Sequence, residues 1–195
     1  MAFYAVDGID GSGKSSAAGF IADILREQGR KVTVVEHPDR SRWSGRVCAR
    51  LLLKDSPGSR FMTGVFFNIN LFSTVLRKRS IMKGCDDLVV VRYTLSSAYI
   101  SESLAHAAYK ALSAVLPEPD VRIYIDIDPD VAMKRIAARG GELESFETSE
   151  RLKEVRDRML SLADDWSKVD NSGSREESEE GLRKVVDSYL ATAAD

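Results

Sequence analysis

The sequence predicts an α/β protein with three layers, in which helices cover both faces of a central parallel sheet of about five strands. Two observations predict this class. Short apolar and β-branched runs, typical of buried strands, alternate along the chain with longer segments whose apolar residues recur every three or four positions, as in amphipathic helices. A glycine-rich loop also follows the first apolar run directly and precedes such a helical segment. Strands joined by helices in this way pair in parallel.

The first expected strand, residues 3–6, leads into the sequence GIDGSGKS at 8–15. This is G-x-x-x-x-G-K-[ST], the P-loop, whose backbone N–H groups surround a phosphate. Lys14 brings a positive charge to the β- and γ-phosphates, and the Ser15 hydroxyl is suited to ligate Mg²⁺. A glycine-rich turn without a ligand is the alternative, but the strand before the loop and the helix after it favour a nucleotide site. We therefore expect a P-loop NTPase fold that binds ATP and Mg²⁺ through Gly8, Ile9, Asp10, Gly11, Ser12, Gly13, Lys14, Ser15 and Ser16.

The composition restricts the class of protein. The chain has 195 residues, and its net charge of −2 shows none of the basic excess of a nucleic-acid-binding surface. Cys48 and Cys85 lack the spacing of metal ligands, and two reduced thiols suit the cytoplasm. No apolar run reaches transmembrane length, and no signal peptide precedes the first strand. We expect one cytoplasmic domain over 1–195 that acts on a small molecule, with no nucleic acid or membrane as partner.

Further strands are expected at residues 31–36, 87–91, 121–126 and, as a short edge strand, 167–172. The nearly continuous apolar run at 87–91 is typical of a central parallel strand. The carboxyl ends of parallel strands meet at one edge of the sheet, where such proteins bind ligands. The P-loop, Glu36 and Arg92 should therefore converge at that edge.

Helices are expected at residues 61–83, 96–116, 150–166 and 178–190. Another should begin at Asp128, which is a good N-cap, with Pro129 at the first helical position. The segment 55–59, rich in Ser, Pro and Gly, reads as a loop. Arginines recur every four residues over 42–50, a pattern that suits a solvated helix face and a phosphate-facing edge equally well.

Arg135 and Arg139 are four residues apart and so share one face of the helix that starts at Asp128. Gly140 and Gly141 follow directly. Two glycines after two aligned arginines suggest a hinged lid, at about residues 135–150, that closes over the site. The alternative is an ordinary helix end with arginines on the surface.

Taken together, these motifs resemble the thymidylate kinases, P-loop kinases that act on nucleoside monophosphates. The stretch FYAVDGIDGSGKSS at 3–16 is similar to the first strand and loop of that family. VRY at 91–93, followed by SSAY at 96–99, is similar to its Asp-Arg-Tyr…Ser…Ala-Tyr-Gln motif. Residues 128–147 and 155–163 resemble its lid and post-lid helix.

The resemblance implies transfer of the γ-phosphoryl group of ATP to the 5′-phosphate of a nucleoside monophosphate, with dTMP as the favoured acceptor, on the route to dTTP. It also implies that Asp10 lies near the acceptor sugar and phosphate and that Arg92 reaches the acceptor phosphate. The family takes a catalytic arginine from the P-loop or from the lid. Because the variable P-loop position here is Ser12, the lid should supply it. The expected catalytic residues are Lys14, Arg92, Arg135, Arg139 and Asp10.

The remaining assignments follow from the same resemblance. Ser15 and Asp10 are the candidates for the metal. Phe66 and Phe67 are most simply core residues, but one of them could stack on a nucleobase. The expected substrate-binding residues are Asp10, Glu36, Phe66, Phe67, Arg92, Tyr93, Ser97 and Tyr99. The family commonly forms dimers, which implies a homodimer through the apolar helix at 61–76.

The chain departs from the family pattern on the acceptor side. Val91 stands where the Asp-Arg-Tyr motif has Asp, Ile100 replaces the base-directed Gln, and the segment 66–71 lacks the arginine that grips the nucleotide. Asn cannot replace a bidentate arginine, and loss of a polar discriminator alters specificity. Two alternatives therefore stay open: a kinase of another (deoxy)nucleotide or small acceptor, and a catalytically weak ATP-binding sensor. A P-loop phosphatase or motor ATPase is disfavoured.

Overall fold

The computed structural model describes residues 2–54, 56–140 and 148–193. Five strands form one sheet in the order β2-β3-β1-β4-β5, and every neighbouring pair is parallel. All five strands expected from the sequence are confirmed, including the short edge strand. They are β1 (Ala2–Asp7), β2 (Val32–Glu36), β3 (Asp87–Val91), β4 (Val121–Asp126) and β5 (Ser167–Asp170).

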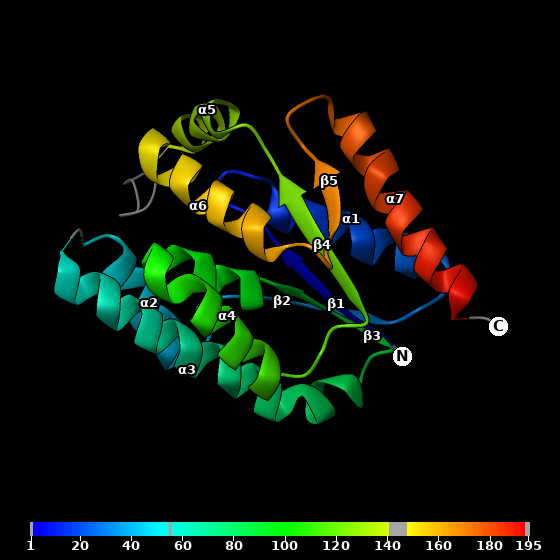
Figure 1. The fold of residues 1–195 in the computed structure, drawn as a ribbon. Helices are drawn as coiled ribbons and strands as arrows, with labels where there is room; N and C mark the ends of the chain where they lie inside the picture. Colours follow the sequence, from blue (N-terminus) through cyan, green and yellow to red (C-terminus); the bar gives the residue numbers. More distant parts are fainter. Residues whose placement is uncertain (1, 55, 141–147, 194–195) are drawn as a thin grey trace.

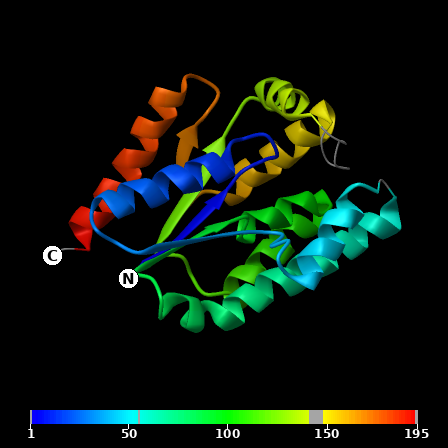
Figure 2. The same cartoon turned by 180° about the vertical axis from the view of Figure 1, so that it is seen from behind.

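Helices cover both faces of this sheet, so the predicted three-layer fold is confirmed (Figures 1 and 2). One face is covered by α1 and α7, which also pack on each other, and the other by α3, α4 and α6. α2 packs on α3. The helices are α1 (Lys14–Glu27), α2 (Trp43–Leu52), α3 (Pro57–Met82), the 3₁₀ helix η1 (Thr94–Tyr99), α4 (Glu102–Val115), α5 (Pro129–Arg139), α6 (Ser149–Leu162) and α7 (Arg175–Thr192).

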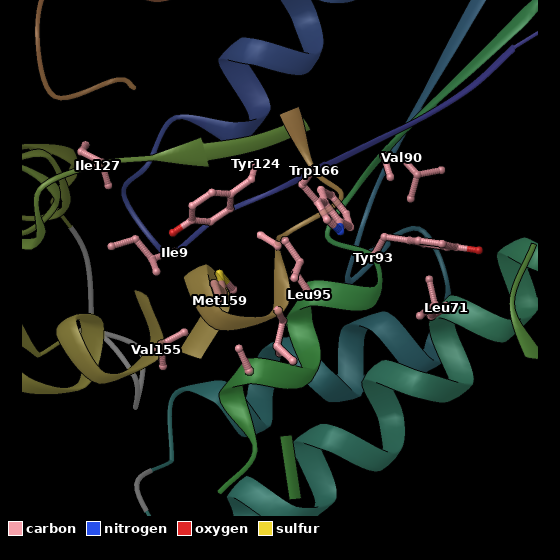
Figure 3. Close-up of a cluster of buried hydrophobic side chains, with 14 of the residues drawn as sticks. Ile9, Leu71, Val90, Tyr93, Leu95, Tyr124, Ile127, Val155, Met159 and Trp166 are labelled. Atoms are coloured by element: carbon pink, nitrogen blue, oxygen red, sulfur yellow. The ribbon is translucent and has the colours of Figure 1, made fainter. Parts of the chain in front are cut away.

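The side chains of β1 alternate between two hydrophobic cores, because successive strand residues point to opposite faces. Phe3 and Ala5 join the core beneath α3 and α6, whose other members include Leu71, Met159 and Trp166 (Figure 3). Ala2, Tyr4 and Val6 join the core beneath α1 and α7. All six β1 residues are buried, so the loop that follows β1 starts from the rigid centre of the molecule.

The helix expected at 96–116 is wrong as one continuous element. The chain forms η1, becomes extended at Ile100 and resumes as α4 at Glu102. Tertiary hydrogen bonds explain the break. The Asp7 carboxylate accepts from the Tyr93 backbone N–H at 2.8 Å, and the Tyr99 hydroxyl donates to Asp10 at 2.9 Å. These two bonds hold the segment from Tyr93 to Tyr99 against the end of β1 and the P-loop, which interrupts the expected continuous helix.

The loop expected at 55–59 is also wrong in its second half, because α3 already begins at Pro57. Ser56 is its N-cap. The Ser56 hydroxyl accepts from the Ser59 backbone N–H, and the Ser59 hydroxyl accepts from the Ser56 N–H, both at 3.1 Å. Proline fits the first helical position, so residues that usually mark a turn here start a helix.

Candidate active site

The loop between β1 and α1 has the conformation that the P-loop sequence requires. Gly11 and Gly13 both have positive φ angles, of 77° and 88°. A Cβ atom at Gly11 would lie 2.7 Å from the Ala132 backbone oxygen, and one at Gly13 would lie 2.6 Å from Asn171 Nδ2. Backbone therefore blocks a side chain at Gly11, and the positive φ angle disfavours one at Gly13, where it would also displace the Asn171 amide. α1 begins directly after this loop, so the positive N-terminal end of the helix faces the loop. This arrangement suits the loop to bind phosphate.

Lys14 is buried at the first position of α1, and its Nζ donates to the Ile9 backbone oxygen at 2.5 Å. Burial, together with repulsion from Arg92, lowers its pKa to about 8. The arrangement keeps the ammonium group inside the loop. The negative charge of a phosphate bound there would raise the pKa of Lys14 again and favour its protonated, positively charged form.

Asp10 is the centre of a charged cluster that joins the P-loop to the end of β3. Its carboxylate pairs with the Arg92 guanidinium, accepts from the Tyr99 hydroxyl at 2.9 Å and lies 3.8 Å from Lys14 Nζ. Burial acts to raise the pKa of Asp10, but attraction by Arg92 and Lys14 outweighs it and holds the pKa at about 2. Asp10 is therefore ionised at neutral pH and fixes the direction of the Arg92 side chain.

Arg92 occupies an unusual backbone conformation, with a φ angle of 65°, which is rare for a residue with a side chain. Its backbone N–H donates to the Val6 oxygen at 3.0 Å, which ties this turn to the end of β1. Such conformations concentrate at functional sites because the surrounding structure must enforce them. Here the conformation of Arg92 directs its guanidinium group to the carboxyl edge of the sheet.

A cavity of about 100 Å³, named here the Arg92 cavity, opens beside this cluster between α2, α3 and η1. It brings together five residues of the expected site: Asp10, Phe67, Arg92, Ser97 and Tyr99. The rest of its wall is mostly apolar. These residues are Pro38, Cys48, Leu52, Thr63, Gly64, Asn68, Ser96, Ile100 and Leu112.

Three expected substrate residues do not line the Arg92 cavity. Phe66 packs edge-to-face against Trp43, with ring centroids 5.9 Å apart. Tyr93 packs against Phe3 in the core, and its hydroxyl donates to a backbone oxygen. Glu36 accepts a hydrogen bond from the Ser15 hydroxyl at 2.7 Å, which places this carboxylate beside the P-loop.

A second cavity, of about 540 Å³ and named here the Arg135 cavity, lies on the other side of the P-loop, between α1, α5 and α7. Arg135 Nη2 donates to the Asn171 backbone oxygen at 2.9 Å, and Asn171 Nδ2 donates to the Ser12 oxygen at 2.7 Å. Asn171 thus links α5 to the P-loop. Sequence reasoning missed it, although a polar residue directly after β5 at the carboxyl edge of the sheet was an available signal.

The predicted lid is only partly described. Arg139 is exposed as the last residue of α5, and Gly140 has a positive φ angle of 71°. Gly141 and the rest of the predicted lid up to residue 147 lie outside the described residues. α6 begins just after this segment.

Within residues 2–54, 56–140 and 148–193, no group of three or more His, Cys, Asp or Glu side chains is arranged to hold a metal ion. Mg²⁺ often binds mainly to substrate phosphates and water, with one or two protein oxygens, and the Ser15 hydroxyl and nearby carboxylates suit that mode. None of the described helices is long and apolar enough to cross a membrane.

Comparison with known proteins identifies the family of the chain. The family model described as thymidylate kinase matches residues 6–182. A probable thymidylate kinase of Archaeoglobus fulgidus is 30% identical over 95% of each chain. The thymidylate kinase of Xylella fastidiosa is 29% identical over 81% of this chain and 76% of its own. The structure of thymidylate kinase from Candida albicans superposes with a TM-score of 0.78 at 20% identity, covering 97% of this chain and 92% of that one, and shows the same fold. The chain belongs to the thymidylate kinase family.

Proposed function

We propose that the protein transfers the γ-phosphoryl group of ATP to the 5′-phosphate of dTMP, which gives dTDP and ADP. The observation that carries this proposal is the Asp10–Arg92 pair. Asp10 belongs to the P-loop and also lines the Arg92 cavity, so the phosphate-binding loop and the second substrate site share one charged contact. The names of the relatives and the family support dTMP as the acceptor.

Each substrate has its own side of the P-loop. The phosphates of ATP would lie on the loop N–H groups and Lys14, with the adenosine in the Arg135 cavity. The phosphate of dTMP would face Arg92, held in place by Asp10. The acceptor oxygen is already ionised, so the reaction needs alignment and charge neutralisation more than a general base.

Ser15 and Asp10 are the residues that would hold Mg²⁺, with Glu36 close enough to receive the Ser15 hydrogen bond. Mg²⁺, when bound, neutralises charge on the phosphate oxygens. Arg135 and Arg139 would supply further positive charge from a lid at about 135–150. We assign the whole chain, 1–195, to one kinase domain, and the buried cysteines Cys48 and Cys85 suit a cytoplasmic location.

The test is a coupled assay of ADP release with Mg-ATP and a panel of nucleoside monophosphates that includes dTMP and dUMP, with a control that lacks an acceptor. We expect turnover to be fastest with dTMP and to fall to background in Lys14→Ala. Turnover on another acceptor would identify a different nucleotide kinase. Binding of ATP without turnover on any acceptor would favour the sensor alternative.

We further propose that the protein is a homodimer through α3. Met62, Ile69 and Leu76 recur every seven residues on this helix, and they are 39%, 41% and 84% exposed. A seven-residue repeat places its members along one line of a helix. A helix of 26 residues with such an exposed line can pack against its own copy.

A further inference from the structure

Two buried polar atoms in the wall of the Arg92 cavity have no hydrogen-bond partner among the described residues: Asn68 Oδ1 and Ser97 Oγ. Asn68 comes from α3, and Ser97, which is only 3% exposed, comes from η1. Buried polar atoms are nearly always paired, because an unpaired one loses its hydration without compensation. Two such atoms in one cavity therefore indicate polar groups on the ligand.

The hydrogen-bonding character of these atoms limits what the ligand can be. Asn68 Nδ2 donates to the Gly64 backbone oxygen at 2.8 Å, which fixes the amide and leaves Oδ1 as an acceptor. The Ser97 hydroxyl can donate. The cavity thus offers an acceptor and a donor, which match in hydrogen-bonding character a ring edge that carries an N–H beside a C=O.

The apolar part of the wall suits a flat ring. Phe67, Leu52 and Leu112 line the same cavity as the two polar atoms. Leu71, three residues beyond Asn68 on α3, is fully buried in the core and brings no polar group to the cavity. Ile100 lines the cavity from the η1 side, also without one. α3 brings two polar side chains to the cavity, Thr63 and Asn68, and of these two Asn68 has a buried atom without a hydrogen-bond partner.

We propose that Asn68 determines the base specificity of the acceptor site by accepting the N3–H of a thymine-type pyrimidine, while Ser97 donates to the adjacent carbonyl. This inference rests on the proposed function. A cytosine ring has no hydrogen at N3, so Asn68 Oδ1 would face a lone pair, and the site would disfavour it.

The experiment compares kcat/KM for dTMP, for dCMP and for N3-methyl-dTMP, which lacks the N–H. Wild type should prefer dTMP over both others by about 10- to 100-fold, the range expected for a buried hydrogen bond left unmade. In Asn68→Ala the preference over N3-methyl-dTMP should collapse towards one, while the KM for ATP stays unchanged. Ser97→Ala should weaken dTMP and N3-methyl-dTMP alike.

Ser73→Ala is the matched control, because the Ser73 hydroxyl bonds within α3 to the Asn70 oxygen and does not line the Arg92 cavity. It should keep the wild-type preference. An Asn68→Ala enzyme that keeps this preference would overturn the inference but leave the proposed function intact. Should that variant not fold, equal binding of thymidine and N3-methylthymidine to wild type would overturn it as well. Absence of any turnover on dTMP by wild type would instead contradict the proposed function.

Discussion

At the scale of single residues, the site depends on an arginine held by an acid. Arg92 has a backbone conformation that few side chains adopt, and its guanidinium is aligned by the ionised Asp10. Tyr99 holds the second oxygen of the same carboxylate. Because burial raises the pKa of Tyr99, its phenol stays protonated and continues to donate. The geometry of Arg92 is therefore fixed before any substrate arrives.

We expect Arg92→Lys to lower kcat/KM for the acceptor by about 10- to 100-fold, because an ammonium group keeps the charge but not the planar pair of N–H donors. The KM for ATP should change little, since Lys14 and the loop N–H groups hold that nucleotide. Steady-state kinetics with each substrate varied in turn would measure both effects. A change of less than twofold in kcat/KM for the acceptor would argue against contact between Arg92 and the acceptor phosphate.

His37 gives a prediction about stability. It is buried directly after β2, with Nε2 at 3.0 Å from the Thr74 hydroxyl. Burial lowers its pKa to about 4 from 6.5. Between these values the unfolded chain binds a proton that the folded chain does not, so the free energy of unfolding falls as the pH falls below 6.5.

The loss from His37 should reach about 2 kcal/mol at pH 5. His37→Gln has no such proton to bind. Urea unfolding at pH 7.5 and pH 5 would give both free energies for wild type and for this variant. Wild type should lose more stability than the variant between the two pH values, and equal losses would show that His37 is not the titrating group.

At the scale of elements, the sequence predicted best those features that local periodicity determines. The strands and α1 follow from apolar patterns and from the glycine-rich loop, and α5 begins at Pro129 with Asp128 as its N-cap, as the capping chemistry predicts. Prediction from the sequence failed where contacts with distant residues determine the backbone conformation. An example is η1, which is shaped by hydrogen bonds to Asp7 of β1 and Asp10 of the P-loop. The same applies to Asn68 and Asn171, because their roles depend on cavities formed by segments far apart in the chain.

Asp128 is the N-cap of α5, and its side chain accepts from the Asp130 N–H at 2.8 Å and the Val131 N–H at 3.4 Å. Asp128→Ala should therefore reduce the free energy of unfolding by about 1 kcal/mol. Asp157→Ala, an exposed position within α6, serves as control and should stay within about 0.5 kcal/mol of wild type. Urea unfolding of the three proteins would test this, and an equal effect of both changes would exclude a special role of the cap.

The two arginines of α5 should separate in function although they lie four residues apart. Arg135 lines the Arg135 cavity, which we assign to adenosine, and it donates a hydrogen bond to the Asn171 backbone oxygen. Arg135→Ala should therefore raise the KM for ATP as well as lower kcat. Arg139 ends the helix at the predicted lid, so Arg139→Ala should lower kcat with little change in the KM for ATP. Identical kinetics of the two variants would contradict this division, and wild-type kinetics in both would leave α5 without a part in the reaction.

At the scale of the whole molecule, the order of the strands explains why two substrates can meet at one loop. β1 lies between β3 and β4. After the P-loop the chain passes through α1 to β2 on the far side of β3, returns to β3, and then crosses over to β4 on the opposite side of β1. Ligands of such sheets bind at this reversal of strand order. The Arg92 cavity forms on the β3 side and the Arg135 cavity on the side of β4 and β5, with the P-loop between them.

The proposed dimer is a property of the whole molecule, because α3 has one line of residues in the Arg92 cavity and another line exposed on the surface.

Wild type should have a mass near twice 21.6 kDa by size-exclusion chromatography with light scattering. Ile69→Arg places a charge in the middle of the exposed stripe and should give a monomer, because a buried charge without a partner is costly. Val115→Arg, at an exposed apolar residue of α4, should stay dimeric. If wild type is a monomer at micromolar concentration, the stripe on α3 does not form a stable dimer. If Ile69→Arg stays dimeric, the contact lies on another face.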